Sequence, residues 1–269
     1  TKFQAYMIRK KWGTRMEKNR QNYIDVSEIC LLAGEIMLAS GAETYRVEDT
    51  MVRIAHAYGV ENAESYVTPT AIIFAVNGEL YPAGTKMKRI ERRTTDLNKI
   101  ATVNSLSREI SEGKWTMESA YERLKQIKKE NISFSVPIQL LAAGIASGCF
   151  VIMFLGKWID VLPGIVAGSI GYFCFLTIHQ IVKVRFFSEF VSSLIIGFTA
   201  NIFVYTGIGD QADKIIIGSV MPLVPGLLIT NAIRDLMVGH LISGLAKGAE
   251  ALLTAFAIGA GIAVAYAIF

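Results

Sequence analysis

The sequence is poor in the residues that build disulfide frameworks and metal sites. Its 269 residues include three cysteines, three histidines and six prolines, and the net charge is only +4. Cys30, Cys149 and Cys174 lie apart in apolar segments, so we expect small buried side chains and neither a disulfide nor a metal site. The small positive charge is spread along the chain and gives no argument for nucleic acid, so we expect no nucleic-acid partner. Composition also excludes a disordered chain, a collagen and a disulfide-rich secreted domain.

The short motifs of the common catalytic sites are also missing. The chain contains no GxSxG, HExxH, CxxC or Walker A sequence, and no GxGxxG follows a predicted strand. His56, His179 and His240 are far apart and lack the spacing of metal ligands. We therefore expect no catalytic residue, no resident cofactor and no metal, and we predict that the protein is not an enzyme.

Charged residues are scarce in the second half of the chain. Residues 137–269 contain 12 of them, against 38 in residues 1–136. An ionised side chain at the centre of a bilayer costs about 3 kcal/mol, and a spanning helix needs about 20 mostly apolar residues. Five segments of 19 residues or more are free of Asp, Glu, Lys and Arg. The predicted transmembrane helices are about 136–156, 161–182, 188–208, 214–233 and 248–269.

Lysine and arginine near the ends of these spans predict the orientation. With the N-terminus inside, six of them lie inside and two outside, and positive residues favour the cytoplasmic side. We expect a multi-pass protein of the cell (inner or plasma) membrane, with a cytoplasmic N-terminus, an external C-terminus and the lipid bilayer as a partner. Small-xxx-small spacing at Gly144/Gly148 and Gly164/Gly168 predicts close packing of the first two spans.

The first half of the chain has the pattern of an α+β domain. Apolar residues at helical spacing predict four helices, over 27–39, 43–58, 97–110 and 117–130. Ser27 and Thr116 are the expected N-caps of the first and last of these helices. A β-branched segment, 64–76, then Asn77-Gly78 and a second segment, 79–90, predict a two-stranded hairpin, with Pro69 at an edge or irregular position.

These elements divide the chain into three parts. Residues 1–22 form a basic arm that either touches anionic lipid headgroups or is a solvated tail. Residues 23–133 form a cytoplasmic α+β domain of order ααββαα. Residues 134–269 form a five-helix transmembrane bundle.

The strongest candidate site lies in the fourth span. Pro222, Pro225 and Gly226 fall in its middle, and each proline removes a backbone hydrogen bond and clashes with the preceding turn. The helix is expected to unwind there, which membranes tolerate only where protein or a water-filled cavity covers the freed carbonyls. Transporters bind solutes at such breaks. The alternative is a structural kink.

Polar residues follow the expected break. Asn231 and Asp235 are four residues apart and share a helix face, and Arg234 stands beside them. Arg234 could clamp a carboxylate of a small polar solute, or could pair with Asp235 as an anchor at the inner interface.

Other polar groups are expected near or within the membrane. Asn201 lies in the third span, where its amide needs either another helix or a permeant solute as partner. Glu189 and Glu250 flank the third and fifth spans. Either could carry a transported proton, although solvation at the interface is the simpler interpretation.

One charged cluster lies in the soluble half. Glu43, Arg46 and Asp49 follow one another at i,i+3 spacing on the second predicted helix. They are either a solvated face held by ion pairs, a gate that docks on the inner mouth of the membrane domain, or a regulatory ligand site.

Three segments resemble the threonine/serine exporter family. They are SGAETYRVEDT at 40–50, VTPTAIIFAV at 67–76, and MPLVPGLLITNAIRDLMVGHLISGLAKGAEALL at 221–253. The resemblance covers nearly the whole chain after about residue 20. It implies a cytoplasmic N-terminal domain, about five membrane helices, and export of threonine, serine or similar small polar metabolites. Relatives are associated with dicarboxylate export, so the resemblance does not fix the substrate.

The chain departs from the fused members of that family, in which a second set of membrane helices follows. It is therefore similar to the longer subunit of the split form and is expected to act with a smaller membrane subunit. With no nucleotide-binding motif, a proton gradient is the expected energy source. The alternative functions are a membrane-anchored cytosolic sensor or enzyme that regulates a partner, and an assembly scaffold. A homo-oligomer is left open.

Overall fold

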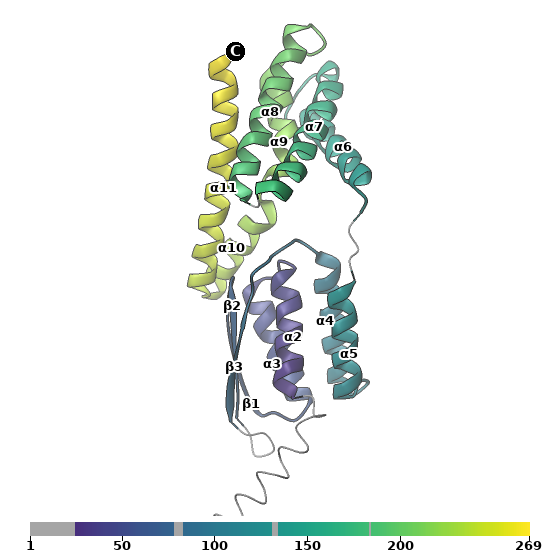
Figure 1. The fold of residues 1–269 in the computed structure, drawn as a ribbon, viewed down its shortest axis with the longest axis vertical. Helices are drawn as coiled ribbons and strands as arrows, with labels where there is room; N and C mark the ends of the chain where they lie inside the picture. Colours follow the sequence, from purple (N-terminus) through teal and green to yellow (C-terminus); the bar gives the residue numbers. More distant parts are fainter. Residues whose placement is uncertain (1–24, 78–82, 131–133, 183) are drawn as a thin grey trace, which may run out of the picture. The chain divides into compact units, whose positions relative to one another are not determined.

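The computed structural model describes residues 25–77, 83–130, 134–182 and 184–269. The chain divides into two compact units, Thr1–Asn131 and Ile132–Phe269, shown in Figure 1. We call them the soluble unit and the membrane unit. The expected basic arm at 1–22, the turn at Gly78 and part of the strand expected at 79–90 lie outside the described residues.

The soluble unit has three layers (Figure 1). A three-stranded antiparallel sheet of order β1-β2-β3 forms the first layer, α2 and α3 pack on one face of it, and α4 and α5 pack on α2 and α3. The elements are α2 (Val26–Ala39), α3 (Thr44–Ala57), β1 (Asn62–Thr68), β2 (Ala71–Asn77), β3 (Gly84–Arg89), α4 (Leu97–Ser111) and α5 (Met117–Lys129).

The predicted order ααββαα is wrong in its sheet, because the segment 64–76 forms two strands. Thr68 pairs with Ala71, which leaves Pro69 and Thr70 as a two-residue turn between β1 and β2. Proline suits the first central position of a tight turn, since its ring fixes φ near −65°. Pro69 therefore ends β1, and the order is ααβββαα.

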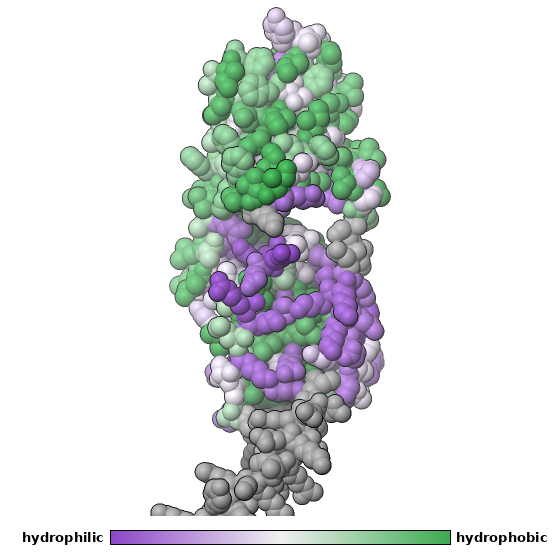
Figure 2. All heavy atoms as spheres, viewed as in Figure 1, coloured by the Kyte–Doolittle hydropathy of each residue, from purple (hydrophilic) through white to green (hydrophobic). Residues whose placement is uncertain are grey.

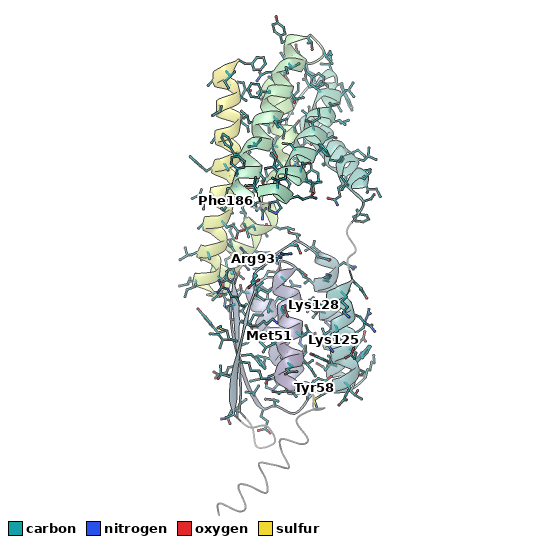
Figure 3. The ribbon with its side chains drawn as sticks, viewed as in Figure 1. Met51, Tyr58, Arg93, Lys125, Lys128 and Phe186 are labelled. Carbon is teal, nitrogen blue, oxygen red and sulfur yellow. The ribbon has the colours of Figure 1, made fainter. Side chains whose placement is uncertain are left out.

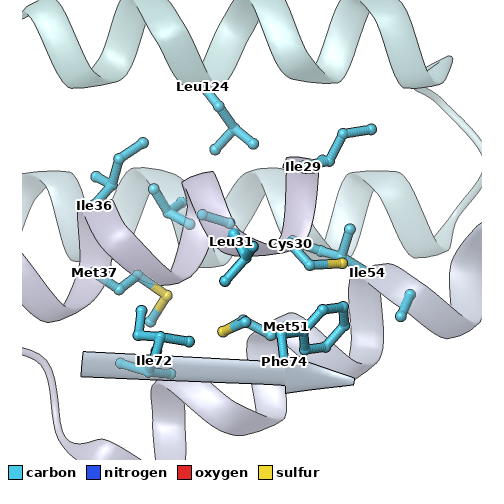
Figure 4. Close-up of a cluster of buried hydrophobic side chains, with 14 of the residues drawn as sticks. Ile29, Cys30, Leu31, Ile36, Met37, Met51, Ile54, Ile72, Phe74 and Leu124 are labelled. Carbon is cyan, nitrogen blue, oxygen red and sulfur yellow. The ribbon is translucent and has the colours of Figure 1, made fainter. Parts of the chain in front are cut away.

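Large apolar side chains fill the core of the soluble unit (Figure 4). Phe74 and Ile72 from the inner face of the sheet meet Met51 of α3 and Met37 of α2 there, and all four are almost fully buried. Figure 3 shows Met51 within this unit. Burial of such side chains stabilises a fold by about 1.5–3 kcal/mol each.

Side-chain caps and ion pairs stabilise the ends of helices in the soluble unit. Asp25 caps α2 by accepting from the Ser27 amide, so the prediction of Ser27 as the cap is wrong, whereas Thr116 caps α5 as predicted. Lys86 of β3 is 2.8 Å from the Asp25 carboxylate. Burial alone raises the pKa of Asp25, but the hydrogen bond and charge of Lys86 and the Ser27 amide outweigh it and lower that pKa.

The membrane unit contains helices only, within the residues described. They are α6 (Val136–Met153), α7 (Trp158–Val182), α8 (Arg185–Tyr205), α9 (Ala212–Val220), the 3-10 turn η1 (Met221–Leu223), α10 (Gly226–Val238) and α11 (Leu241–Ile268). Four of them, α6, α7, α8 and α11, are long and apolar enough to cross a membrane by themselves.

The predicted fourth span is not one helix. The segment from α9 through η1 and the helix α10 meet at an angle of 63°, so the unit has four continuous spans, or five when the bent pair counts as one. The predicted fifth span, 248–269, begins seven residues too late. α11 starts at Leu241 and contains both Lys247 and Glu250.

Small residues bring α6 and α7 together, as their spacing predicts. A Cβ on Gly148 would lie 2.7 Å from Ile165, and one on Gly164 would lie 2.5 Å from Val151. The visible surface of the membrane unit is largely apolar (Figure 2).

Of the three cysteines, only Cys30 is fully buried. Cys149 is exposed, so the expectation of a buried side chain there is wrong.

Candidate functional site

The break between α9 and α10 is built by the two prolines. Pro222 lies in the 3-10 turn η1, and Pro225 is the residue that precedes α10. Between them, Val224 has an extended backbone, with φ −64° and ψ 129°. Because neither proline has an N–H, the carbonyls of Gly218 and Met221 cannot make their usual helical bonds. The amides of Met221 and Val224 reach them in shorter turns instead.

The break leaves the N-terminal end of α10 open. Its first helical bond runs from the Ile229 amide to the Pro225 carbonyl, at 3.0 Å, while the Val224 carbonyl accepts from Gly226. Among the described residues, no side chain caps α10, and a Cβ on Gly226 would meet none of their atoms within 4 Å. Free amides and the helix dipole make such an end positive, which favours a carboxylate.

The predicted polar residues of α10 lie beyond its open end and differ in exposure. Asn231 is half-buried and Arg234 is exposed. Asp235 is completely buried, and its carboxylate is 2.7 Å from Nζ of Lys247 on α11. Along a helix axis, Asp235 lies about 13 Å from Gly226. The structure thus groups Pro222, Pro225 and Gly226 at the break and places Asp235 in an ion pair with the next helix.

A polar strip runs along one face of α11. Lys247, Glu250 and Thr254 follow at spacings of three and four residues, so they lie on consecutive turns of one side. Lys247 contacts Asp235 of α10, and Glu250 faces Arg185 of α8 at 3.9 Å. We call these three residues the α11 polar strip, and it connects the broken span with α8.

The helices α8 and α11 run parallel to each other. At their beginnings, Arg185 is near Glu250. Towards their ends, the rings of Phe198 and Phe269 have centroids 5.8 Å apart. Contacts that advance together along both sequences define parallel neighbours. Gly197 lies against Ala265 and Gly261 against Ser193, so α11 begins about 18 Å before the level of the start of α8.

Glu189 of α8 is buried within the membrane unit. Only 1% of the residue is exposed, and its Oε1 accepts from Nε of Arg185 at 2.9 Å. Its Oε2 has no hydrogen-bond partner among the described residues. The expectation that Glu189 is solvated at the interface is therefore wrong. Gly197 lies against Ala265, and Gly261 lies against Ser193, so Thr254 of α11 lies less than one helical turn before the level of Glu189.

Asn201 has a partner that sequence analysis did not consider. Its Nδ2 donates to the Gly197 carbonyl of its own helix at 3.0 Å. Neither a second helix nor a solute is needed to satisfy that donor. Asn201 is not part of the break, which is formed by residues of α9, η1 and α10.

The charged cluster of the soluble unit forms the expected ion pairs. Arg46 lies 2.8 Å from Glu43, and Asp49 pairs with Arg53 one turn farther along α3. Glu43 is 7% exposed and precedes the first turn of α3. Glu48 accepts from the Val67 amide at 2.9 Å, which ties α3 to β1. Glu43 and Asp49 therefore belong to two separate pairs.

Sequence analysis missed the Asp235–Lys247 pair and the burial of Glu189. Treating charged residues as the ends of spans placed Lys247 outside the fifth predicted helix and Glu250 at its edge. One signal was available, because the three residues of the α11 polar strip follow at helical spacing in an otherwise apolar segment. Among the described residues, no cluster of three His, Cys, Asp or Glu could hold a metal ion.

Several known proteins similar to this chain are named as probable transporters. A family model described as "Putative threonine/serine exporter" matches residues 28–269. The chain belongs to the threonine/serine exporter family. Residues at the break, in the α11 polar strip and at Glu189 all lie within the matched range. With several helices long enough to span a bilayer, it is a multi-pass membrane protein.

Individual members of the family differ in length and in name. A protein of Klebsiella aerogenes named "Probable succinate transporter subunit YjjP" is 24% identical, over 93% of this chain and 96% of its own length. Its Escherichia coli namesake is 22% identical, over 91% and 94%. The "Probable threonine/serine exporter" of Mycobacterium tuberculosis is 24% identical over 89% of this chain, but over only 45% of its own length. No solved structure matches the chain.

Proposed function

We propose that the protein is a subunit of a secondary active exporter of small polar metabolites, driven by the proton gradient. The observation that carries the proposal is the break at Pro222–Gly226 inside an apolar pair of helices. A break in lipid leaves backbone groups unsatisfied unless a cavity or a solute serves them. An enzymatic role has no comparable support, because the family is one of transporters.

The proposed substrates share a carboxylate. The open, uncapped end of α10 offers amides and a positive dipole to a negative group, and none of the described residues fills the space beside Gly226. Threonine, serine and succinate all carry a carboxylate, so this chemistry fits the names of both kinds of relative. Asn231 and the exposed Arg234 lie on the same helix and are the proposed contacts for the rest of the solute.

We propose that α9 and α10 together cross the membrane once. α8 and α11 are parallel neighbours, so both begin at the same face of the bundle. The α9–α10 pair connects the end of α8 to the start of α11 and must therefore return to that face. This gives five crossings, and with the positive-inside rule it supports a cytoplasmic N-terminus and an external C-terminus in the inner or plasma membrane.

We propose that a second membrane subunit completes the transport path. The M. tuberculosis relative extends well beyond its match to this chain, and two relatives are named as subunits. Alternating access commonly needs two structural halves around one site. For the soluble unit, we propose that the Glu43–Arg46 pair and Asp49 gate or regulate transport. The support is the burial of Glu43 beside a charged partner.

Efflux from loaded cells tests the proposal. Cells that produce the chain with its genomic neighbours are loaded with threonine and serine dipeptides or with succinate, and export is followed with and without the gene. In Pro225→Leu, the leucine amide can bond to the Met221 carbonyl, so that α10 extends back into the break. We expect efflux to fall about tenfold or more, because a displaced binding group loses most of its effect.

Pro137→Leu is the matched control, since Pro137 stands in the exposed first turn of α6, away from the break. It should export like wild type, and both variants should reach the membrane in equal amounts. If deletion of the gene changes the efflux of none of these solutes, or if Pro225→Leu exports normally, the proposed function is wrong.

A further inference from the structure

We propose that Glu189 binds and releases the proton that drives transport, and that Arg185 changes partner when it does so. The inference rests on the proposed function and identifies the coupling residue within it. It concerns a buried carboxyl group, one of the two that the sequence leaves as possible proton carriers. Glu189 is the acidic residue of α8, and it lies one turn inside the start of that helix.

The hydrogen bonds of Glu189 are incomplete. Oε1 accepts from Nε of Arg185 at 2.9 Å, while the buried Oε2 has no partner among the described residues. An ionised carboxylate accepts hydrogen bonds at both oxygens, and a buried oxygen left without one costs free energy. A neutral carboxylic acid instead carries one O–H donor. The site therefore lacks the second hydrogen-bond donor that a permanently ionised carboxylate needs.

Two hydroxyl groups near Glu189 are also without partners. Ser192 Oγ and Thr254 Oγ1 are fully buried and make no hydrogen bond within the described parts of the chain. Ser192 is the next turn of α8 after Glu189, and the close approach of Gly261 to Ser193 places Thr254 on α11 less than one turn before the level of Glu189. Each hydroxyl can accept the proton of a carboxylic acid. Protonation of Glu189 therefore provides an O–H donor for hydroxyl oxygens that otherwise accept no hydrogen bond among the described residues.

Arg185 is placed to respond to that proton. Its guanidinium lies between two carboxylates, with Nε bonded to Glu189 and Nη1 3.9 Å from Glu250. The side chain is 42% exposed, so it can move. When the Glu189 carboxylate takes a proton from water, it becomes neutral and Arg185 shifts towards Glu250. When the proton leaves to water, the original pair forms again.

The other charged and titratable groups around α8 are few within the described residues. α11 carries Lys247, Glu250 and Tyr266, the second half of α7 carries Tyr172, Cys174 and His179, and the charges of α9 are in its first turn. Lys247, in turn, holds Asp235 of the broken span. A change at Glu250 can therefore reach α10 through the α11 polar strip, which is a contiguous set of contacts.

Transport in membrane vesicles tests the inference. Inverted vesicles from source cells that lack the gene, or carry it as wild type or variant, are given labelled serine or succinate. Accumulation driven by a pH gradient is compared with exchange at equal solute on both sides. For Glu189→Gln, gradient-driven accumulation should fall about tenfold or more, while exchange stays near wild type and no longer depends on pH. Glu189→Asp keeps a carboxyl group and should recover part of the coupling.

Asp213→Asn is the control, because Asp213 is an exposed carboxylate in the first turn of α9. It should behave as wild type. If wild type accumulates a solute and Glu189→Gln accumulates it equally, the inference is wrong and the proposed function stands. If wild type moves none of the solutes, the proposed function itself fails.

A second measurement does not depend on transport. Infrared difference spectra of the purified full-length protein, taken between mildly acidic and mildly alkaline pH, report the C=O band of protonated carboxyl groups. Wild type should gain a band at acidic pH that is absent in Glu189→Gln and kept in Asp213→Asn. Identical spectra for wild type and Glu189→Gln would overturn the assignment, whatever the transport assay gives.

Discussion

In the soluble unit the large apolar residues lie inside, whereas in the membrane unit many of them lie outside. The soluble core is made of residues such as Phe74, Met51 and Leu124. The membrane unit buries serines, threonine and charged pairs, and it exposes leucine, isoleucine and phenylalanine along its helices. Figure 2 shows the apolar surface that results.

The difference follows from the solvent. Water drives apolar side chains together in the soluble unit. Lipid tails are as apolar as leucine, so helices in a membrane associate through close packing of small residues and through polar contacts. Glycine and ionised residues therefore have opposite roles in the two units. In the soluble unit they lie mostly at the surface and at the ends of elements, whereas in the membrane unit most glycines within helices and four ionised residues, Asp160, Glu189, Asp235 and Lys247, lie at helix contacts.

The largest effect is expected from truncation in the soluble core. Phe74→Ala removes a ring that is 1% exposed and should lower the free energy of unfolding of that unit by about 4 kcal/mol. Ile73→Ala, on the opposite face of the same strand and 38% exposed, should change it by less than about 0.5 kcal/mol. Limited proteolysis in denaturant of the full-length protein measures both. Equal effects would contradict the assignment of the core face.

In the membrane unit, the corresponding sensitive site is an ion pair. Lys247→Met leaves the buried Asp235 carboxylate without its partner at 2.7 Å and should destabilise the unit by about 3 kcal/mol. The double variant Asp235→Asn/Lys247→Met removes the uncompensated charge and should recover part of that loss. Thermal aggregation of detergent-purified protein gives the comparison. A double variant that is less stable than Lys247→Met would show that the pair is not coupled.

Two glycines of the membrane unit, one tightly packed and one open, test the role of small residues in helix packing. A Cβ on Gly218 would lie 2.8 Å from the Val151 nitrogen and 2.9 Å from the Ser147 carbonyl oxygen, both of which are backbone atoms. Gly218→Ala should therefore cost about 2 kcal/mol. Gly259→Ala meets nothing within 4 Å and should be neutral or slightly stabilising, because alanine favours a helix. The same thermal assay applies, and equal stabilities would be inconsistent with the packing of α6 on α9.

The helices of the soluble unit could be predicted closely from the sequence. The expected 27–39 and 43–58 correspond to Val26–Ala39 and Thr44–Ala57, because apolar residues repeat there at helical spacing. The turn at Pro69 was missed, since β-branched residues continue on both sides of it and hide the hairpin. Asp25 was missed as the cap because Ser27, two residues later, is an equally suitable residue type.

In the membrane unit, the prolines predicted the break but not its geometry. Pro222 and Pro225 lack amide hydrogens, which is a local property of the sequence. Whether the chain bends by 63° there depends on how α10 packs against α11. The buried position of Glu189 and the pairing of Asp235 with Lys247 depend on contacts between helices, and a single sequence does not reveal them.

Accessibility of Gly226 to water tests the central claim most directly. In a variant whose three native cysteines are replaced, Gly226→Cys places a thiol at the break, and Gly259→Cys places one on the apolar surface of α11 as a control. We predict that a charged, membrane-impermeant thiol reagent labels Gly226→Cys but not Gly259→Cys, and that serine, threonine or succinate slows the labelling. If Gly226→Cys reacts no faster than Gly259→Cys from either side of the membrane, the break does not face a solute path and the account is wrong.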